Sequence, residues 1–227
     1  MSNLVNVMSV DVEDWYHSSL DLFKDTNISH GTKPEQSVVD NTLKCLEILA
    51  NTNNRATFFV LATVCEYYPD LIREILHQGH EIGTHGYAHN LIYKQTPQEF
   101  EADVKKSLEI LSQIEPNIKG YRAPYWSIVK RSIWAIDVLI KCGLQYDSSI
   151  FPIHRGLYGI PDAPTTPYEI SPGFWEYPPA TIPFFGQNIP IAGGGYLRML
   201  PYFMIKYGIK KANRKSQAPN PLVFYMH

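Results

Sequence analysis

Three carboxylates stand within four positions near the beginning of the sequence: Asp11, Glu13 and Asp14. They close the segment 4–12, whose apolar pattern is typical of a β-strand, so they occupy a strand end and the turn after it. A turn needs only one aspartate, and three adjacent carboxylates repel one another unless a cation or an arginine lies nearby. The cluster therefore predicts one side of a cation-binding or acid–base site. The alternative is a solvated acidic loop.

Two histidines, His85 and His89, follow the short apolar segment 80–84. In a helical turn, residues four apart share one face, so both imidazoles can reach the same metal ion. Two histidines and one carboxylate form a divalent-metal site that keeps open positions for water and substrate. A single histidine is more often a packing residue, and we interpret the unpaired ones mainly as structural or surface residues: His17, His30, His77, His80 and His154.

Three further apolar segments end in polar residues. Arg122 precedes a proline-stiffened turn, and its planar guanidinium can bind a carboxylate through two hydrogen bonds; a surface arginine is the alternative. Asp147, Ser148 and Ser149 are interpreted as a turn with local side-chain bonds. His227 ends the segment 222–226, and its imidazole has a pKa suited to acid–base work near neutral pH.

The elements that must position these residues alternate between strand and helix. Strands are expected at 4–12, 57–60, 80–84, 118–122, 144–147 and 222–226, and helices at 37–50, 69–78, 96–111, 130–143 and 201–212. Thr96 and Glu99 form a capping box at the start of one helix, and Gly143 is expected to end another. About seven strands alternating with helices predict an α/β fold with a barrel-like parallel sheet, whose chemistry collects at the carboxyl ends of the strands.

Length and composition restrict the class of protein. The 227 residues predict a single domain spanning 1–227, and a net charge of −2 without a basic cluster argues against a nucleic-acid partner. No apolar run approaches the roughly 20 residues that span a bilayer. The first residues lack the features of a signal peptide, so we expect a cytoplasmic protein. The three cysteines are unpatterned and predict no disulfide framework.

The stretch 151–197 holds nine prolines and nine aromatic residues but only four charged ones. It is too apolar for a solvated linker and too rich in proline for a regular helix, so we expect a long, ordered loop insertion. Aromatic faces stack on sugar rings, which makes this stretch a candidate lid over a site. Hydrophobic capping of the barrel is the alternative. The substrate-binding candidates, here and beside Arg122, are Tyr125, Trp126, Trp175 and Tyr196.

In order along the chain, four segments resemble the motifs of the polysaccharide deacetylases, which are carbohydrate esterase family 4 with nodulation-type (NodB) homology. These segments are Asp11-Val12-Glu13-Asp14, the run 79–89, Arg122-Ala123-Pro124-Tyr125 and Met226-His227. The Asp-x-Glu-Asp-Trp opening and the segment 193–198 are similar to a subgroup associated with exopolysaccharide and surface-glycan synthesis. The resemblance implies a distorted (β/α)7 barrel, in agreement with the independent strand count.

The resemblance also implies three ligands for a divalent metal ion, expected to be Zn²⁺: Asp14, His85 and His89. It implies that Asp11 is the general base, that Arg122 holds this base, and that His227 is the general acid. Family openings have two adjacent aspartates, whereas here two residues separate Asp11 from Asp14. Two alternatives follow: Glu13 is the base beside Asp14, or Glu13 is itself the metal ligand.

We therefore expect a metal-dependent hydrolase that removes N-acetyl groups from an amino sugar in a poly- or oligosaccharide or a glycan precursor. The alternatives are a hydrolase of another C–N bond, in a cyclic imide or ureide, and a non-catalytic glycan-binding protein. The expected partner is a carbohydrate. Relatives continue beyond the residue that matches His227, so we expect either a truncated chain or an unusually short protein.

Overall fold

A computed structural model describes residues 6–17, 32–214 and 221–227. This part of the chain contains an eight-stranded sheet in which seven consecutive strands run parallel and one edge strand is antiparallel. In spatial order the strands are β10 (Val223–Met226), β1 (Val7–Val12), β2 (Thr57–Val60), β3 (Glu81–Thr84), β4 (Gly120–Tyr121), β5 (Tyr146–Asp147), β7 (Phe174–Glu176) and β6 (Tyr168–Ser171).

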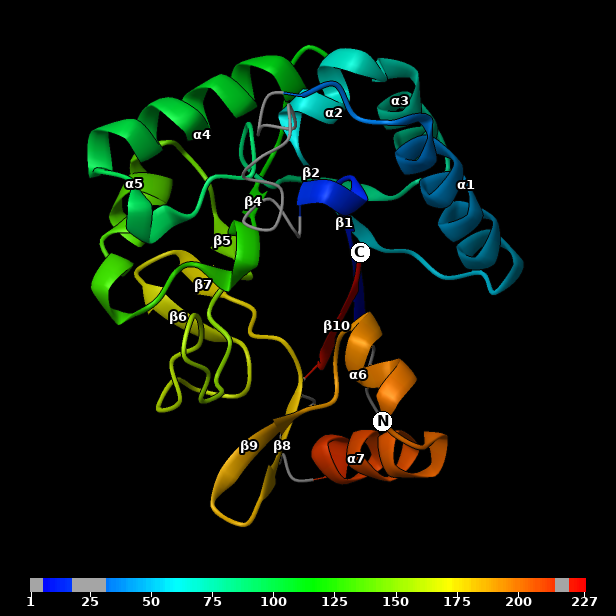
Figure 1. Ribbon diagram of the computed structural model, residues 1–227, viewed down its shortest axis with the longest axis vertical. Coiled ribbons are helices and arrows are strands. Elements are labelled where there is room, and N and C mark those ends of the chain that lie inside the picture. Colours follow the sequence, from blue (N-terminus) through cyan, green and yellow to red (C-terminus); the bar gives the residue numbers. More distant parts are fainter. Residues whose placement is uncertain (1–5, 18–31, 215–220) are drawn as a thin grey trace.

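The helices that connect the parallel strands pack along the outside of the curled sheet (Figure 1). They are α1 (Gln36–Asn51), α2 (Ala62–Tyr67), α3 (Pro69–His77), α4 (Pro97–Leu111) and α5 (Ala135–Lys141). Strand β2 is buried along its whole length, and its Phe58 and Val60 share one hydrophobic cluster with Leu46 of α1 and Ile72 of α3. A second cluster joins Val104 of α4 to Leu139 of α5. The architecture confirms the expected α/β barrel-like class.

The capping box predicted at residue 96 is present. The Thr96 hydroxyl accepts a hydrogen bond from the Glu99 amide, and the Glu99 carboxylate accepts one from the Thr96 amide at 2.7 Å. Pro97 occupies the first helical position, where a missing N–H costs no hydrogen bond. Local sequence therefore fixes where α4 begins.

Other boundaries differ from the sequence-based expectation. The helix expected at 130–143 is a 3-10 turn, Lys130–Ser132, followed by α5. Gly143 lies beyond α5 with φ +86°, which agrees with the expected left-handed helix end. The strands expected at 118–122 and 144–147 pair only over β4 and β5. At Gly120 the absence of a side chain leaves room for the Tyr146 ring, which lies where a Cβ would stand.

The two sides of the curled sheet approach each other through the segment that follows β7. The Tyr177 amide donates to the carbonyl of Asp147 on β5, and the Ala180 amide donates to the carbonyl of Val223 on β10. Pro179 and Val223 form an isolated parallel bridge. A few residues thus connect β5 with β10, and the seven parallel strands form a curled half-barrel of the barrel-like class that the sequence predicts.

The proline- and aromatic-rich stretch is less irregular than expected. It contains the β6–β7 hairpin and a separate two-stranded hairpin of β8 (Thr181–Phe184) and β9 (Gln187–Pro190). Within the expected ordered loop insertion, residues 168–190 therefore contain strands that the sequence did not predict. Prolines remain compatible with strands here because Pro183 and Pro190 belong to a two-stranded ribbon, in which each strand has one unpaired edge.

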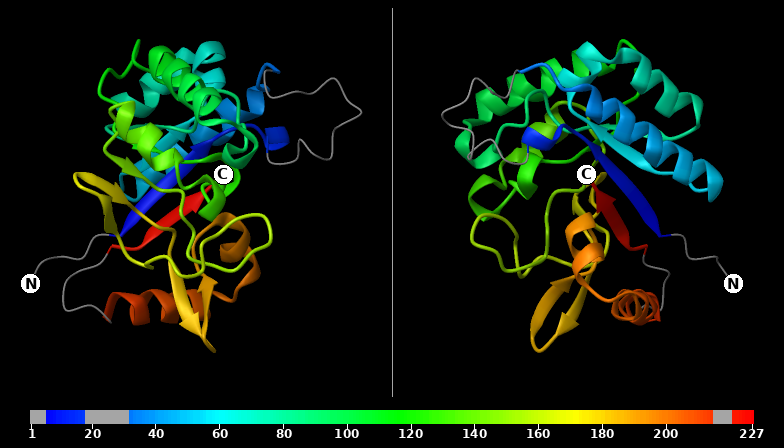
Figure 2. Two further views of the ribbon diagram at one scale, coloured as in Figure 1. Left: turned by 90° about the vertical axis from the view of Figure 1, so that its left-hand side faces the viewer. Right: turned by 45° about the vertical axis from the view of Figure 1, so that its right-hand side comes forward.

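The chain then forms α6 (Gly194–Met199) and α7 (Tyr202–Arg214), the second of which agrees with the helix expected at 201–212. A third hydrophobic cluster packs Phe151, Ile191 and Tyr225 together and closes this side of the barrel. The β8–β9 turn and α7 both lie at one end of the molecule (Figures 1 and 2). Among the described residues, no helix is both long enough and apolar enough to cross a bilayer.

Candidate metal and catalytic site

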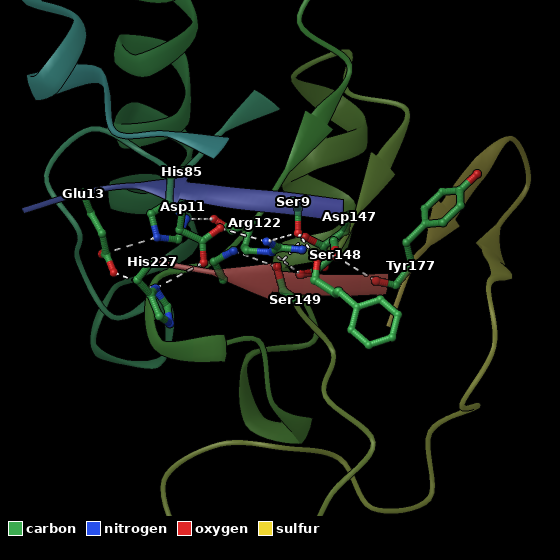
Figure 3. Close-up of polar contacts among 12 residues, drawn as sticks. Ser9, Asp11, Glu13, His85, Arg122, Asp147, Ser148, Ser149, Tyr177 and His227 are labelled. Carbon is green, nitrogen blue, oxygen red and sulfur yellow. Dashed lines mark hydrogen bonds and ion pairs between the residues drawn. The ribbon is translucent and has the colours of Figure 1, made fainter. Parts of the chain in front are cut away.

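Polar side chains from four strand ends meet at one edge of the sheet. Asp11 lies near the end of β1, His85 directly follows β3, Arg122 directly follows β4, and His227 directly follows β10. Because these strands are parallel, their carboxyl ends open on the same side, and Figure 3 shows the four side chains gathered there.

Glu13, His85 and His89 form a group that can hold a metal ion. Their ligand atoms all lie within 4.8 Å of one another. Glu13 Oε2 is 2.6 Å from His89 Nε2 and 3.7 Å from His85 Nε2, and the three side chains are almost fully buried. Two imidazole nitrogens and one carboxylate oxygen are ligands that suit a divalent transition metal.

The surroundings of this group fit a metal ion. Glu13 Oε2 is buried and faces the Nε2 atoms of both imidazoles. His85 Nδ1 lies 2.7 Å from the carbonyl oxygen of Arg122, so it carries the proton and leaves the Nε2 lone pair directed at Glu13. The Glu13 carboxylate oxygen and the Nε2 atom of His85 thus face each other, and a cation between them would bind to both.

Neighbouring histidines keep Glu13 ionised. Burial alone would raise the pKa of the Glu13 carboxyl, but attraction to His89 and hydrogen bonds to His227, His85 and His89 hold this pKa well below its usual range. A metal ligand must be deprotonated, so the site favours the state that binds a cation.

The two histidines converge by a route other than the predicted one. Residues 85–89 are not helical, and the chain turns at Gly86, with φ +81°, and at His89, with φ +59°. A non-glycine residue with positive φ is strained, and such strain is typical of functional sites. The pairing of the two histidines agrees with the sequence, whereas the expected helical turn is wrong.

Asp14 lies outside the metal-binding group. Its Oδ1 accepts the amide hydrogen of Trp15 at 2.8 Å, and its Oδ2 accepts the amide hydrogen of Glu35 at 2.5 Å. The Asp14 amide in turn donates to Nδ1 of the buried His17 at 2.9 Å. Asp14 therefore fixes the loop around Glu13, and it is the carboxylate of Glu13, not that of Asp14, that lies with the two histidines.

Burial suppresses protonation of His17, the imidazole beside this loop. Desolvation and the proximity of His89 lower the pKa of His17 to about 3, against a smaller opposing effect of Glu13. Its ring centroid lies 5.5 Å from that of His89. The expected structural role of His17 agrees with this position.

Asp11 is held by Arg122. The Arg122 Nη1 lies 2.8 Å from Asp11 Oδ1 and 2.7 Å from Ser9 Oγ. On its other side the guanidinium donates to the carbonyl and hydroxyl oxygens of Ser148 at 3.0 and 2.8 Å. The side chain is fully buried, with its Cζ 4.2 Å from the centroid of the Phe59 ring. Arg122 is therefore an interior cation, and the surface alternative is excluded.

His227 lies on the other side of the two acids. Its Nδ1 is 2.9 Å from Glu13 Oε1 and 3.5 Å from Asp11 Oδ2, while about half of its side chain is exposed. Burial lowers the pKa of His227, but the hydrogen bond to Glu13 and attraction to both carboxylates outweigh it and raise the pKa above its usual value. The imidazolium is the favoured state in this position.

A second pair of carboxyls is buried behind Arg122. Asp147 and Glu176 are paired residues of the adjacent strands β5 and β7, and both are fully buried. Ser149 Oγ lies 2.5 Å from Asp147 Oδ1, and the Ile150 amide donates to Glu176 Oε1 at 3.0 Å. Burial raises the pKa of Asp147 to about 6 and also raises the pKa of Glu176 well above its usual value, so the pair favours a bound proton. Sequence reasoning assigned Asp147 to a turn and missed Glu176.

Two cavities flank the acidic side chains. One of about 270 Å³ is lined by Glu13, the two histidines of the metal group, Tyr125, Trp126, Tyr158 and His227, among others. The other, of about 390 Å³, is lined by Asp11, Glu13, Asp14 and His227 together with Trp15, Ser37, Asn41 and Arg198, among others. Asp11, Glu13 and His227 border both cavities, so groups bound on either side can reach them.

The predicted aromatic residues divide into two groups. Tyr125 and Trp126 line the smaller cavity, both with positive φ, and the Tyr125 ring lies 4.8 Å from that of His89. Trp175 lies on β7 and Tyr196 on α6, and neither lines the two cavities. Tyr158 does line the smaller cavity and was missed, because its only signal was membership of the aromatic stretch.

A histidine–histidine–carboxylate group beside an arginine-held aspartate, at the carboxyl ends of parallel strands, is typical of barrel-like metal-dependent hydrolases. The chain belongs to the polysaccharide deacetylase family, whose model matches residues 31–146, just over half of the sequence. Residues 148–227 match a second model, described as a domain of unknown function, DUF3473. His227 falls in this second region.

Curated and solved proteins resemble the chain over different extents. A peptidoglycan-N-acetylglucosamine deacetylase of Bacillus cereus is 34% identical over 98 residues, which are 42% of this chain and 36% of that protein. A crystal structure of a peptidoglycan N-acetylglucosamine deacetylase has TM-score 0.54 and 16% identity, covering 99% of this chain and 72% of that one. The crystal structure of the allantoinase Puue has TM-score 0.66 and 13% identity, covering 97% and 76%. The two structural similarities concern the fold.

Proposed function

We propose that the protein is a metal-dependent amide hydrolase that removes N-acetyl groups from an amino sugar in a poly- or oligosaccharide or a glycan precursor. The observation that carries this proposal is the placement of the Asp11–Arg122 pair and His227 around the group formed by Glu13, His85 and His89. The name of the Bacillus cereus relative supports N-acetylglucosamine as the sugar.

Glu13, His85 and His89 are the proposed ligands, and Zn²⁺ is the proposed ion because it accepts this mixture of nitrogen and oxygen ligands. A divalent ion held there supplies Lewis acidity, which polarises the acetyl carbonyl and lowers the pKa of water at an open position. The Arg122 carbonyl orients His85 through Nδ1 and so keeps Nε2 available to a ligand.

Asp11 is the proposed general base. Arg122 engages its Oδ1, which leaves Oδ2 on the side of His227 and of both cavities. A carboxylate in this position can accept the proton of an attacking water, and the permanent positive charge of Arg122 keeps it oriented. The alternative in which Glu13 is the base loses support because Glu13 contacts both histidines.

His227 is the proposed general acid. The two carboxylates raise its pKa and so favour the protonated ring, and the side chain borders both cavities. From there it can protonate the departing sugar nitrogen, so that the amide yields acetate and a free amine. Tyr125 and Trp126 are the proposed walls for a sugar ring.

Product analysis tests the proposal. The full chain is incubated with N-acetylglucosamine oligomers and, separately, with a cyclic ureide, before and after treatment with a chelator and readdition of Zn²⁺. We expect acetate from the oligomers, its loss with the chelator and its recovery with the metal. Ring opening of the ureide without acetate release from the sugar would instead identify the other C–N hydrolase. A protein that binds the oligomers without either reaction would be a glycan-binding protein.

A further inference from the structure

The last part of the chain differs from the rest in charge. From Tyr177 to His227 the sequence contains six lysines and arginines and not one of the 22 acidic residues of the protein. The whole chain has a net charge of −2, so the basic character is confined to this part. The described elements here are the β8–β9 hairpin, α6, α7 and β10. A surface built from them attracts anions without competition from its own carboxylates.

Helix α7 leaves large apolar side chains on the surface. Tyr202, Phe203 and Tyr207 are 75%, 71% and 64% exposed. The opposite face of the helix is packed: Ile205 is buried, and a Cβ at position 208 would lie 3.3 Å from Ile182 of β8. The helix is thus anchored to the hairpin by one face and presents aromatic rings on the other.

The β8–β9 turn adds two more aromatic rings. Phe184 and Phe185 are 57% and 92% exposed, and their rings contact each other edge to face at 4.6 Å. This turn and α7 lie at the same end of the molecule in all views (Figures 1 and 2). Exposed aromatic side chains that cluster on one end of a monomer mark a surface that contacts something else.

Lysine side chains of α7 lie near two of its exposed tyrosine rings. Lys206 Nζ lies 5.9 Å from the centroid of the Tyr202 ring, and Lys211 Nζ lies 6.0 Å from that of Tyr207. Aromatic rings at the level of the headgroups, with lysines that extend toward phosphates, are characteristic of helices that lie flat in a membrane interface. Phe184 and Phe185 pack edge to face against each other, so they form a compact apolar tip that suits insertion into lipid rather than two parallel platforms for base stacking.

We propose that the β8–β9 turn and the exposed face of α7, here called the basic–aromatic surface, dock on an anionic lipid bilayer. Positive charge without neighbouring carboxylates is complementary to anionic headgroups. The exposed rings would bury their apolar surface at the boundary between headgroups and acyl chains. Helix α6 directly precedes α7, and its Arg198 lines the larger cavity beside Asp11 and His227. If the proposed deacetylase activity holds, docking brings that cavity close to substrates carried on lipids.

Vesicle cosedimentation of the full chain tests the docking. The probes are vesicles of phosphatidylcholine alone and vesicles that also contain phosphatidylglycerol, at low and at raised salt. We expect binding to the anionic vesicles, weak binding to the neutral ones, and a decrease with salt. Absence of binding to anionic vesicles at low salt would overturn the proposal.

Two variants locate the surface. Lys206→Gln combined with Lys210→Gln removes two charges, and Phe185→Ser removes the most exposed ring; each is expected to weaken vesicle binding about tenfold or more. The matched control, Lys44→Gln combined with Lys94→Gln, removes the same charge from α1 and from the 3-10 turn Ile92–Lys94. Equal losses in variant and control would mean that no particular surface binds, and the proposal would fail.

Two further experiments test whether the basic–aromatic surface binds something other than a lipid bilayer. Sedimentation in solution shows whether Phe203→Ser disperses a dimer, which would make a second copy of the chain the occupant and would contradict docking on lipid. Tighter binding to single-stranded DNA than to anionic vesicles, unaffected by Phe185→Ser, would also contradict it. Acetate release from a soluble N-acetylated oligosaccharide should stay unchanged in the Lys206/Lys210 variant, so the docking and the proposed reaction are tested independently.

Discussion

The Arg122 guanidinium lies 2.8 Å from the Asp11 carboxylate, and the exposed fractions of these two side chains are 1% and 2%. The same guanidinium is bound by Ser9 from β1 and by Ser148, which follows β5, so it connects opposite sides of the curled sheet. A buried ion pair of this kind gains its attraction at reduced dielectric and needs every remaining donor satisfied. The buried hydrogen-bond network around Arg122 therefore holds the Asp11 carboxylate in place, and Asp11 cannot rotate freely toward the metal-binding group.

Asp11→Asn should lower turnover by about 100-fold or more while metal content stays unchanged, because the amide keeps the shape of the side chain but accepts no proton. Steady-state kinetics and metal analysis of the same preparation check this. Unchanged turnover would remove Asp11 as the base and leave Glu13 as the next candidate.

Glu13→Gln and Asp14→Asn should have different effects. The first should weaken metal binding at least about tenfold, because it replaces the proposed carboxylate ligand. The second should keep the metal but lower the free energy of unfolding by about 1–3 kcal/mol, because the Glu35 and Trp15 amides lose a charged acceptor. Metal titration and urea unfolding measure the two effects. The reverse result would restore Asp14 as ligand.

Arg122→Lys should lower the free energy of unfolding by about 3 kcal/mol, because a lysine cannot reproduce the four hydrogen bonds of the guanidinium in the same geometry. Turnover should fall as well, since Asp11 loses its fixed partner. Ser9→Ala is the milder control, expected to cost about 1 kcal/mol. If Arg122→Lys behaves like Ser9→Ala, the guanidinium geometry has no special role.

His227→Ala should slow hydrolysis of N-acetylglucosamine oligomers by about 100-fold, because no proton reaches the departing nitrogen. An N-acetyl anilide has a better leaving group and should lose much less. Comparison of the two substrates in wild type and variant checks the role. Equal losses on both would indicate that His227 acts by another route, such as positioning Glu13.

The Asp147–Glu176 pair predicts an unusual pH dependence of stability. Both carboxyls have pKa values above their usual range in the folded protein, so the folded state binds more protons than the unfolded state. The stabilisation is complete below about pH 4, where unfolded acids are also protonated, and is lost as pH rises through about 6 and above.

Glu176→Gln keeps a donor toward Asp147 and should flatten this dependence. Unfolding by urea between about pH 4 and 8 measures it. The matched control is Glu169→Gln on the neighbouring β6, at an exposed position. A control that flattens the profile equally would exclude the buried pair as its source.

Much of the architecture could be predicted because the relevant signals are local. The Thr96 capping box predicts the start of α4, and Gly143 predicts the end of α5. The apolar segments predict most of the strands. The site was partly predictable too, since residues that follow parallel strands must share one edge, which brings Asp11, His85, Arg122 and His227 together.

The choice among the acidic residues could not be predicted because it depends on distant contacts. The Asp14 carboxylate accepts a hydrogen bond from the amide of Glu35, 21 residues away, and no local sequence pattern predicts that contact. Glu176 and Tyr158 depend on how the aromatic stretch folds, which proline and aromatic content do not specify. Trp175 was placed near the site by composition, but its strand directs it elsewhere.

The position of His227 in the site depends on the register in which β10 pairs with β1. Val10 pairs with Met226, and the Ser9 hydroxyl donates to the carbonyl of Phe224, 215 residues away. A slip of one residue in this pairing would move His227 by about 3.3 Å and turn its side chain to the opposite face of the sheet. The proposed acid catalysis by His227 thus requires the two ends of the described chain to have found their native alignment, which would make enzymatic turnover a reporter of completed folding.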